Sequence, residues 1–287
     1  MTTQDQYYVP TVARWPIVGA IGLFLMTSGA ATMMNEIPAG LWILLFGCAV
    51  MIVMFSGWFA EVIAESERGI FKRNEDYSFR LGMIWFILSE VMFFAAFFGA
   101  LFYTRMFSVP WIGGEGTGAM TNQLLYPGYD AAWPTAGPGQ LGGAFEIIPA
   151  FGLPLVNTLL LLTSGLTITL AHWALKKSKR GPLIGWMIAT VLLGSTFLFF
   201  QVTEYIHAYR ELGLTLGSGI YGSTFFMLTG FHGVHVTFGT IMLIVITLRC
   251  ISGHFTADKH FAFEGVAWYW HFVDVVWLGL FIFVYVL

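Results

Sequence analysis

The sequence predicts an all-α integral membrane protein with seven transmembrane helices, and three observations support this fold class. The 287 residues are 57% hydrophobic and only 10% charged, whereas soluble domains carry about 25% charged residues. The mean hydropathy is +0.75, and seven separate apolar stretches are long enough to cross a bilayer. Because lipid offers no hydrogen-bond partner to the backbone, these stretches are expected to be helices rather than isolated strands.

Each expected span is near or above the roughly 20 residues that a transmembrane helix requires. Only residues 35–39 separate the first two spans, which are therefore expected to form a tight helical hairpin. A segment rich in glycine and proline, residues 105–153, follows the third span and is expected to be an ordered loop outside the membrane. The seven spans cover residues 15–34, 40–64, 80–104, 154–175, 182–205, 223–248 and 261–287.

The lysines and arginines predict how the chain crosses the membrane. If the N-terminus is cytoplasmic, eleven of the 13 basic residues fall in cytoplasmic segments, and only Arg105 and Arg210 fall outside. Positive charge concentrates in the cytoplasmic segments of membrane proteins. The asymmetry therefore favours an inner-membrane protein with a cytoplasmic N-terminus and a periplasmic C-terminus. The net charge of -3 gives no indication of nucleic-acid binding.

One carboxylate, Glu90, lies in the middle of the third span. Ten residues separate it from Arg80, which at about 1.5 Å per residue corresponds to about 15 Å along a helix. This is half of a hydrocarbon core about 30 Å thick. If Arg80 marks one membrane surface, Glu90 lies near the midplane, where a carboxylate is expected to be protonated, hydrogen-bonded or turned toward protein. Such a residue is either functional or a specific contact between two helices.

Further polar residues recur in the later spans, where hydrogen bonds between helices satisfy such groups. His232 and His235 are three residues apart and therefore share a helix face. The same spacing would let His271 and Asp274 bond to each other. We interpret the whole set as interhelical polar contacts: Gln201, Glu204, His232, His235, Glu264, His271 and Asp274.

A metal-binding interpretation was weighed against these contacts, because imidazole is a common ligand of haem iron and copper. Three of the seven histidines, His207, His254 and His260, fall at span ends or in loops. Glycines flank His232 and His235, which favours close helix packing over metal binding. The two cysteines show no metal-ligand spacing, and no hydrolase, kinase or dehydrogenase motif is found. We therefore assign this chain no metal ligand and no catalytic residue.

Three long segments carry a family resemblance. They are RLGMIWFILSEVMFF at 80–94, YGSTFFMLTGFHGVHVTFG at 221–239 and FEGVAWYWHFVDVVWLGLF at 263–281. In this order they resemble subunit III of the haem–copper cytochrome c oxidases, of the bacterial type. Weaker similarities, such as LVNTLLLLTSG at 155–165 and QVTEY at 201–205, extend the resemblance over nearly the whole chain.

The resemblance implies a two-helix pair and a five-helix bundle with phospholipid in the cleft between them. It divides the chain into residues 1–79, with an N-terminal arm, the hairpin and a cytoplasmic loop, and residues 80–287, with the bundle. The implied function is that of a non-catalytic accessory subunit of a proton-pumping terminal oxidase that passes electrons from cytochrome c to oxygen. Haem and copper would lie in partner subunits, subunit I being the main contact and subunit II belonging to the same complex. The chain itself would support the stability of subunit I and its proton uptake.

The resemblance also implies roles for particular residues. Glu90 matches the family's buried carboxylate. Arg80 matches the basic residue that begins the same helix, and it is expected to bind lipid together with Arg249 and His254. Arg249 and His254 fall where the family places a basic contact to a lipid head group, which is also what charge attraction predicts. The chain departs from the family where Ala60 and Ala64 replace basic residues, so fewer charges would hold an anionic lipid there.

Two alternatives remain beside this interpretation. Subunit III of a quinol oxidase is related but usually lacks the first hairpin, and a copper-binding partner subunit would distinguish the two. A seven-helix transporter could line a path with carboxylates such as Glu90 and Glu204, but the chain lacks an internal repeat and a pair of broken helices. A proton channel through Glu90 is not expected, because no series of ionisable side chains in its span leads to either surface.

Overall fold

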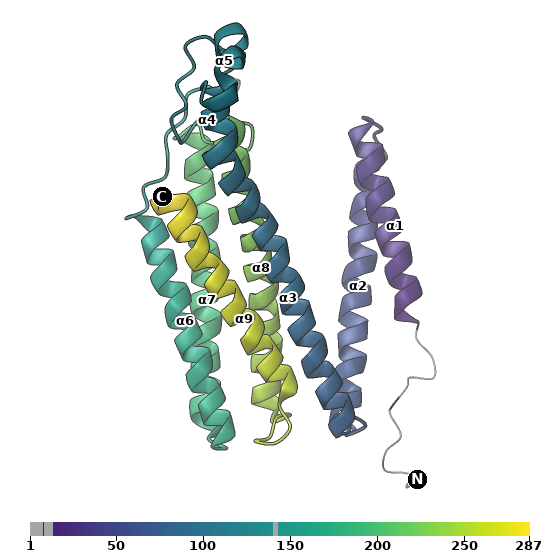
Figure 1. Cartoon of the computed structure of the whole chain (residues 1–287). Helices are drawn as coiled ribbons and strands as arrows, with labels where there is room; N and C mark the ends of the chain where they lie inside the picture. The colour runs from purple at the N-terminus through teal and green to yellow at the C-terminus, as the bar shows by residue number, and fades with distance from the viewer. Residues whose placement is uncertain (1–7, 9–13, 140–142) are drawn as a thin grey trace. The chain divides into compact units, whose positions relative to one another are not determined.

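The computed structural model describes residues 8, 14–139 and 143–287, and it is helical without any strand in that part of the chain (Figure 1). Among these residues, seven helices are long and apolar enough to cross a membrane. The predicted fold class, an all-α protein with seven spanning helices, is confirmed. The spans are Trp15–Met34, Gly40–Glu67, Arg73–Ile112, Leu153–Lys176, Arg180–Arg210, Gly219–Ser252 and Phe261–Val286.

Several helices are longer than the apolar stretches from which they were predicted. The third helix, α3 (Arg73–Tyr103), begins seven residues before Arg80. Its first turn contains Glu75 and Asp76, and the Glu75 carboxylate accepts the backbone N–H of Lys72 at 3.0 Å. Acidic groups at this position satisfy unpaired N–H groups and suit the helix dipole, so the polar residues 73–79 are helical.

The chain forms two compact units, residues 1–79 and 80–287, and the boundary falls within α3. In the first unit, α1 (Trp15–Met34) packs along α2 (Gly40–Glu67). The residues that this packing buries are almost all glycines, which lie seven apart at Gly22 and Gly29 on α1 and at Gly40 and Gly47 on α2. A Cβ atom at Gly47 would lie 2.6 Å from the backbone nitrogen of Met26. The absence of side chains therefore lets the two backbones touch.

Polar contacts connect the start of α1 and the residue Tyr8 before it to the last turns of α2 and the first turn of α3. The indole N–H of Trp15 donates to the Glu61 carboxylate. The Tyr8 hydroxyl donates to Glu65 Oε1 at 2.9 Å, and this hydrogen bond raises the pKa of the Tyr8 phenol. The Tyr8 backbone N–H donates to Glu75 Oε1 at 2.7 Å. The rest of the expected N-terminal arm, residues 1–7 and 9–13, lies outside the described residues.

The second unit is built from α6 (Leu153–Lys176), α7 (Arg180–Arg210), α8 (Gly219–Ser252) and α9 (Phe261–Leu280), together with α3 from Arg80 onward (Figure 1). Sequential helices pack against one another, and α9 also packs against α6, which closes the group. Aromatic side chains link α3 to this group: Phe93 meets Phe231 of α8, and Phe94 meets Phe272 of α9, with ring centres 5.1 and 6.1 Å apart.

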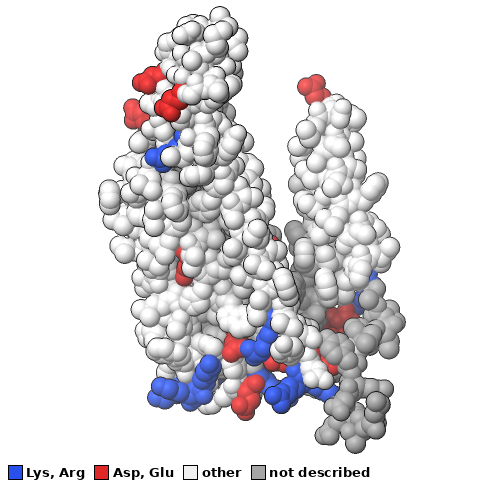
Figure 2. All heavy atoms as spheres, in the orientation of Figure 1, with Lys and Arg blue, Asp and Glu red and all other residues white. Residues whose placement is uncertain are grey.

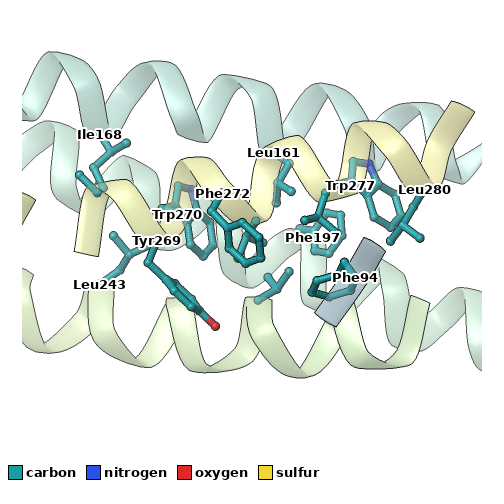
Figure 3. Close-up of a cluster of buried hydrophobic side chains, with 14 of the residues drawn as sticks. Phe94, Leu161, Ile168, Phe197, Leu243, Tyr269, Trp270, Phe272, Trp277 and Leu280 are labelled. Carbon is teal, nitrogen blue, oxygen red and sulfur yellow. The ribbon is translucent and has the colours of Figure 1, made fainter. Parts of the chain in front are cut away.

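A single tryptophan joins the four packed helices of this unit. Trp270 of α9 is fully buried, and its indole N–H donates to Ser164 Oγ of α6 at 2.8 Å. A Cβ atom at Gly194 of α7 or at Gly239 of α8 would lie 2.8 or 2.9 Å from the Trp270 ring, so both glycines make room for it. Figure 3 shows Trp270 and Trp277 among the buried side chains around α9. This explains why tryptophan occurs here, far from a helix end.

The segment between α3 and α6 contains more helix than the expected loop. The α3 helix continues through a π-helical turn, Thr104–Ser108, into α4 (Val109–Ile112), and α5 (Ala119–Leu125) follows. The Glu146 backbone N–H donates to the carbonyl of Leu212 at 2.9 Å, which attaches the segment to the turn after α7. Residues 140–142 lie outside the described part of the chain.

Basic residues gather at one end of the second unit, which we call the basic end. Here α6 ends, α7 begins, α8 ends and α9 begins. The turn between α6 and α7 presents exposed side chains at Lys176, Lys177, Lys179 and Arg180. Figure 2 shows lysine and arginine side chains gathered at this end.

Candidate functional site

The buried carboxylate that the sequence singled out has a histidine partner. Glu90 Oε2 lies 3.0 Å from His235 Nε2, which joins α3 to α8 across 145 positions of sequence. The side chains are 22% and 15% exposed, respectively. Glu90 is therefore hydrogen-bonded and turned toward protein, and His235 faces it rather than simply packing beside a glycine.

The second ring nitrogen of His235 determines how many protons this pair holds. His235 Nδ1 lies 2.7 Å from the carbonyl oxygen of Phe231, which can only accept, so Nδ1 carries a hydrogen. If neither Nε2 nor Glu90 carried one, two acceptors would face each other. One proton therefore lies between them, and the pair has no net charge whichever group holds it. Electroneutrality removes much of the cost of placing a carboxylate in an apolar region.

Aromatic rings surround this pair. The rings of Phe94 and Tyr269 have centres 5.0 and 6.4 Å from that of His235. The Tyr269 hydroxyl donates to the backbone carbonyl of His235 at 3.2 Å. Phe94 is almost fully buried and also contacts Phe272. The rings pack around the pair, so it is a local contact among α3, α8 and α9, and the Tyr269 hydroxyl is the further ionisable group in these contacts.

A second polar group lies at the basic end and combines residues from three helices. Arg80 of α3 donates to Glu264 Oε2 of α9. The other oxygen, Oε1, lies 3.4 Å from His172 Nε2 of α6 and 3.2 Å from His260 Nε2, the residue that precedes α9. The two Nε2 atoms are 3.3 Å apart. The structure thus connects Arg80 and Glu264, which the sequence had assigned to different roles.

Two of the three residues expected to bind lipid, Arg249 and His254, lie near each other at the end of α8, whereas Arg80 is paired with Glu264. Arg249 is only 8% exposed, and its guanidinium lies 4.6 Å from the ring centre of Phe255. The His254 backbone N–H donates to the Arg249 carbonyl at 3.1 Å, and the His254 side chain is exposed. Of the pair, His254 is the one open to its surroundings.

The remaining polar contacts lie elsewhere in the bundle. Glu204 Oε1 accepts the hydroxyl of Tyr285 at 2.6 Å and the amide of Gln201 at 3.4 Å. His232 is fully buried, and its Nε2–H donates to the carbonyl of Val273 at 3.2 Å. The first bond of Glu204 joins α7 to the turn after α9, the second lies within α7, and the His232 bond joins α8 to α9.

The expected contact between His271 and Asp274 is different. His271 Nδ1 and Asp274 Oδ2 are 3.8 Å apart, which is too long for a hydrogen bond. His271 Nε2 instead lies 3.3 Å from Thr169 Oγ1 of α6. Residues three apart on a helix are close enough to meet, but here the neighbouring helix provides the nearer partner.

The sequence interpretation missed several partners. Tyr269 and Tyr285 were not assigned polar contacts, and His172 and His260 were not connected to Glu264. One signal was available: His260 and Glu264 are four residues apart and so share a helix face. Their contact with His172 joins positions 88 and 92 residues away along the chain, for which the sequence pattern gives no sign.

Comparison with known proteins finds similarity over nearly the whole chain. A sequence model of the family described as cytochrome c oxidase subunit III matches residues 5–121 and 128–287. The chain is 39% identical to cytochrome c oxidase subunit 3 of Marchantia polymorpha over 286 residues, 99% of this chain and 97% of the relative. It is 38% identical to the subunit 3 proteins of Oncorhynchus mykiss and Raphicerus melanotis, over 97% and 99% of this chain and 96% and 98% of those relatives.

Proposed function

Because this chain belongs to the cytochrome c oxidase subunit III family, we propose that it is an accessory subunit of a proton-pumping terminal oxidase. The observation that carries the proposal is the sequence similarity to subunit 3 proteins over nearly the whole chain. The seven helices long enough to span a membrane agree with a membrane-embedded subunit. In this role the chain contributes no redox centre. It supports the stability of subunit I and proton uptake, while partner subunits hold the haem and copper and receive electrons from cytochrome c.

The proposal includes an orientation and a lipid role. The basic end faces the cytoplasm, with the N-terminus on the same side and the C-terminus in the periplasm, as the distribution of lysine and arginine favours. Phospholipid binds to the chain, with its phosphate attracted by basic residues at this end. The exposed His254 and the nearby Arg249 are the proposed head-group contacts, and Arg80, which is paired with Glu264 at this end, is a third proposed lipid-binding residue.

The first test is purification of a tagged chain from its native membrane in mild detergent, followed by a reduced-minus-oxidised optical spectrum and identification of the accompanying subunits. We expect haem absorption and a copper-containing subunit II in the same preparation. A copper-free partner and a quinol-oxidising activity would assign the chain to a quinol oxidase instead. A colourless chain without partners, even after crosslinking in the intact membrane, would contradict the proposal.

The Glu90–His235 pair is expected to stabilise the bundle rather than to conduct protons. Replacing Glu90 with glutamine should leave the proton-pumping stoichiometry unchanged, because the contacts around the pair are aromatic and the hydroxyl among them, on Tyr269, is bonded to the backbone carbonyl of His235. Proton release by oxidase vesicles per electron transferred is the measurement. A matched control is Glu36→Gln, at an exposed carboxylate between α1 and α2. Loss of pumping in the Glu90 variant alone, with electron transfer and assembly intact, would contradict this expectation.

Arg249 tests the lipid role. Replacing it with alanine should reduce co-purifying phospholipid or shorten the active lifetime of the complex, since one basic residue near an anionic surface contributes about 1 kcal/mol, roughly fivefold in affinity. Phosphorus content per haem and the decay of activity during turnover are the measurements. Arg249→Lys retains the charge and should lose less lipid, while Arg210→Ala at the opposite end of α7 is the control. Unchanged lipid content and lifetime would rule out this role.

A further inference from the structure

We propose that His172, His260 and Glu264 form a binding site for a divalent transition-metal ion, and that zinc is the ion that fits it best. This inference concerns only residues of this chain and does not depend on the proposed function. The site lies at the basic end, where α6 ends and α9 begins. One ligand atom from each residue lies within 4.8 Å of the other two.

The spacing of the three ligand atoms matches the edges of a zinc coordination tetrahedron. Ligands at about 2.0–2.1 Å from a tetrahedral zinc ion lie about 3.3–3.4 Å from one another. In the structure the two histidine Nε2 atoms are 3.3 Å apart, and they lie 3.4 and 3.2 Å from Glu264 Oε1. All three edges thus agree with the tetrahedral value within about 0.2 Å.

The surrounding contacts orient two of the ligands as they are oriented in metal sites. His260 Nδ1 lies 3.0 Å from the carbonyl oxygen of Thr256, so Nδ1 carries the hydrogen and Nε2 presents its lone pair to the cluster. A backbone carbonyl on the distal nitrogen is a common second contact of metal-bound histidine. Arg80 binds the far oxygen of Glu264 and leaves Oε1 directed at the two imidazoles.

Without a cation, His260 Nε2 and Glu264 Oε1 face each other as two acceptors, and only a hydrogen on His172 Nε2 can bridge them. His260 Nε2 is an acceptor when the ring is neutral, and Glu264 Oε1 is an acceptor when the carboxylate is ionised. A metal ion would use both lone pairs and that of His172 Nε2 at once. Two imidazole nitrogens and one carboxylate favour zinc over magnesium or calcium, which prefer oxygen ligands. Three protein ligands leave the fourth position for water.

The cluster is also accessible. His260 and Glu264 have side chains 7% and 12% exposed, which limits competition from bulk water, while His172 is 20% exposed and forms the open side. A zinc ion here would join α6 to the start of α9 and so fix one end of the bundle.

Zinc binding is tested with the full-length chain, purified together with any subunits that accompany it and stripped of metal by a chelator. After dialysis against buffered zinc, the metal content per chain is determined by mass spectrometry. The wild type should retain about one zinc per chain more than His260→Gln. The control His207→Gln changes a histidine near the opposite end of α7 and should retain as much zinc as the wild type. Equal zinc contents in all three preparations would overturn the proposal.

A second measurement needs no variant and so does not depend on the folding of His260→Gln. Carbethoxylation of His172 by diethyl pyrocarbonate is followed by peptide mass spectrometry with and without zinc. At zinc concentrations about ten times the dissociation constant, the reaction at His172 should slow about tenfold, because the fraction of chains with an empty site falls about tenfold. His207 should react at an unchanged rate, and magnesium at the same concentration should protect neither residue. Equal rates at His172 with and without zinc would refute metal binding here.

Discussion

Replacing Trp270 with alanine is expected to lower the free energy of unfolding of the five-helix unit by about 3 kcal/mol, at the lower end of the range for tryptophan-to-alanine changes in cores. Trp270 is fully buried, fills the space left by Gly194 and Gly239, and bonds to Ser164 at 2.8 Å. The lost free energy of unfolding comes from packing contacts and from the hydrogen bond. Transfer from water contributes little, because the helices of a membrane bundle are surrounded by lipid.

The unit contains its own reporter for this experiment. Cys250 of α8 is 2% exposed, so its reaction with a fluorogenic maleimide during heating reports unfolding of the bundle. Cys48→Ser in the background removes the only other cysteine of the chain. A loss of 3 kcal/mol should lower the midpoint by about 6–12 °C in a unit of this size.

An exposed tryptophan provides the matched control. Trp173 of α6 is 58% exposed, and its replacement with alanine should change the free energy of unfolding by no more than about 0.5 kcal/mol. If Trp270→Ala and Trp173→Ala shifted the midpoint equally, Trp270 would not be the residue that joins the four helices.

Replacing Gly29 with alanine is expected to destabilise the α1–α2 hairpin by about 2–3 kcal/mol, the cost of forcing an extra methyl group into a packed interface. The added Cβ would lie 2.7 Å from Leu44 Cα, and that neighbour is backbone rather than a flexible side chain. The two helices must therefore separate. The measurement is maleimide labelling of Cys48, which lies one helical turn after Leu44, in a Cys250→Ser background.

The same helix offers a closely matched control. A Cβ atom at Gly19 would meet only Met54 Cε, at 3.4 Å, which is the end of a flexible side chain at ordinary contact distance. Gly19→Ala should therefore label at the wild-type rate, while Gly29→Ala should label faster. Equal labelling of the two variants would show that the close approach of α1 and α2 does not depend on Gly29.

Local patterns in the sequence determined the number of membrane-spanning helices. Apolar runs such as residues 15–34 must be helical in lipid, because only a helix satisfies its own backbone there. The lone carboxylate Glu90 was identified for the same reason, since an ionisable group in such a run needs a protein partner. Motif order along the chain was sufficient to identify the family.

Only the tertiary structure decided which residues meet. Glu90 and His235 are 145 positions apart, and Arg80 and Glu264 are 184 positions apart. Such pairs depend on how each helix is rotated about its axis and how deeply it sits beside its neighbours. In a soluble helix, hydrophobic periodicity reveals that rotation. In a membrane helix the lipid-facing and protein-facing sides are both apolar, so the consecutive aromatics Trp268, Tyr269 and Trp270 give no indication that the last two are the ones buried in the core.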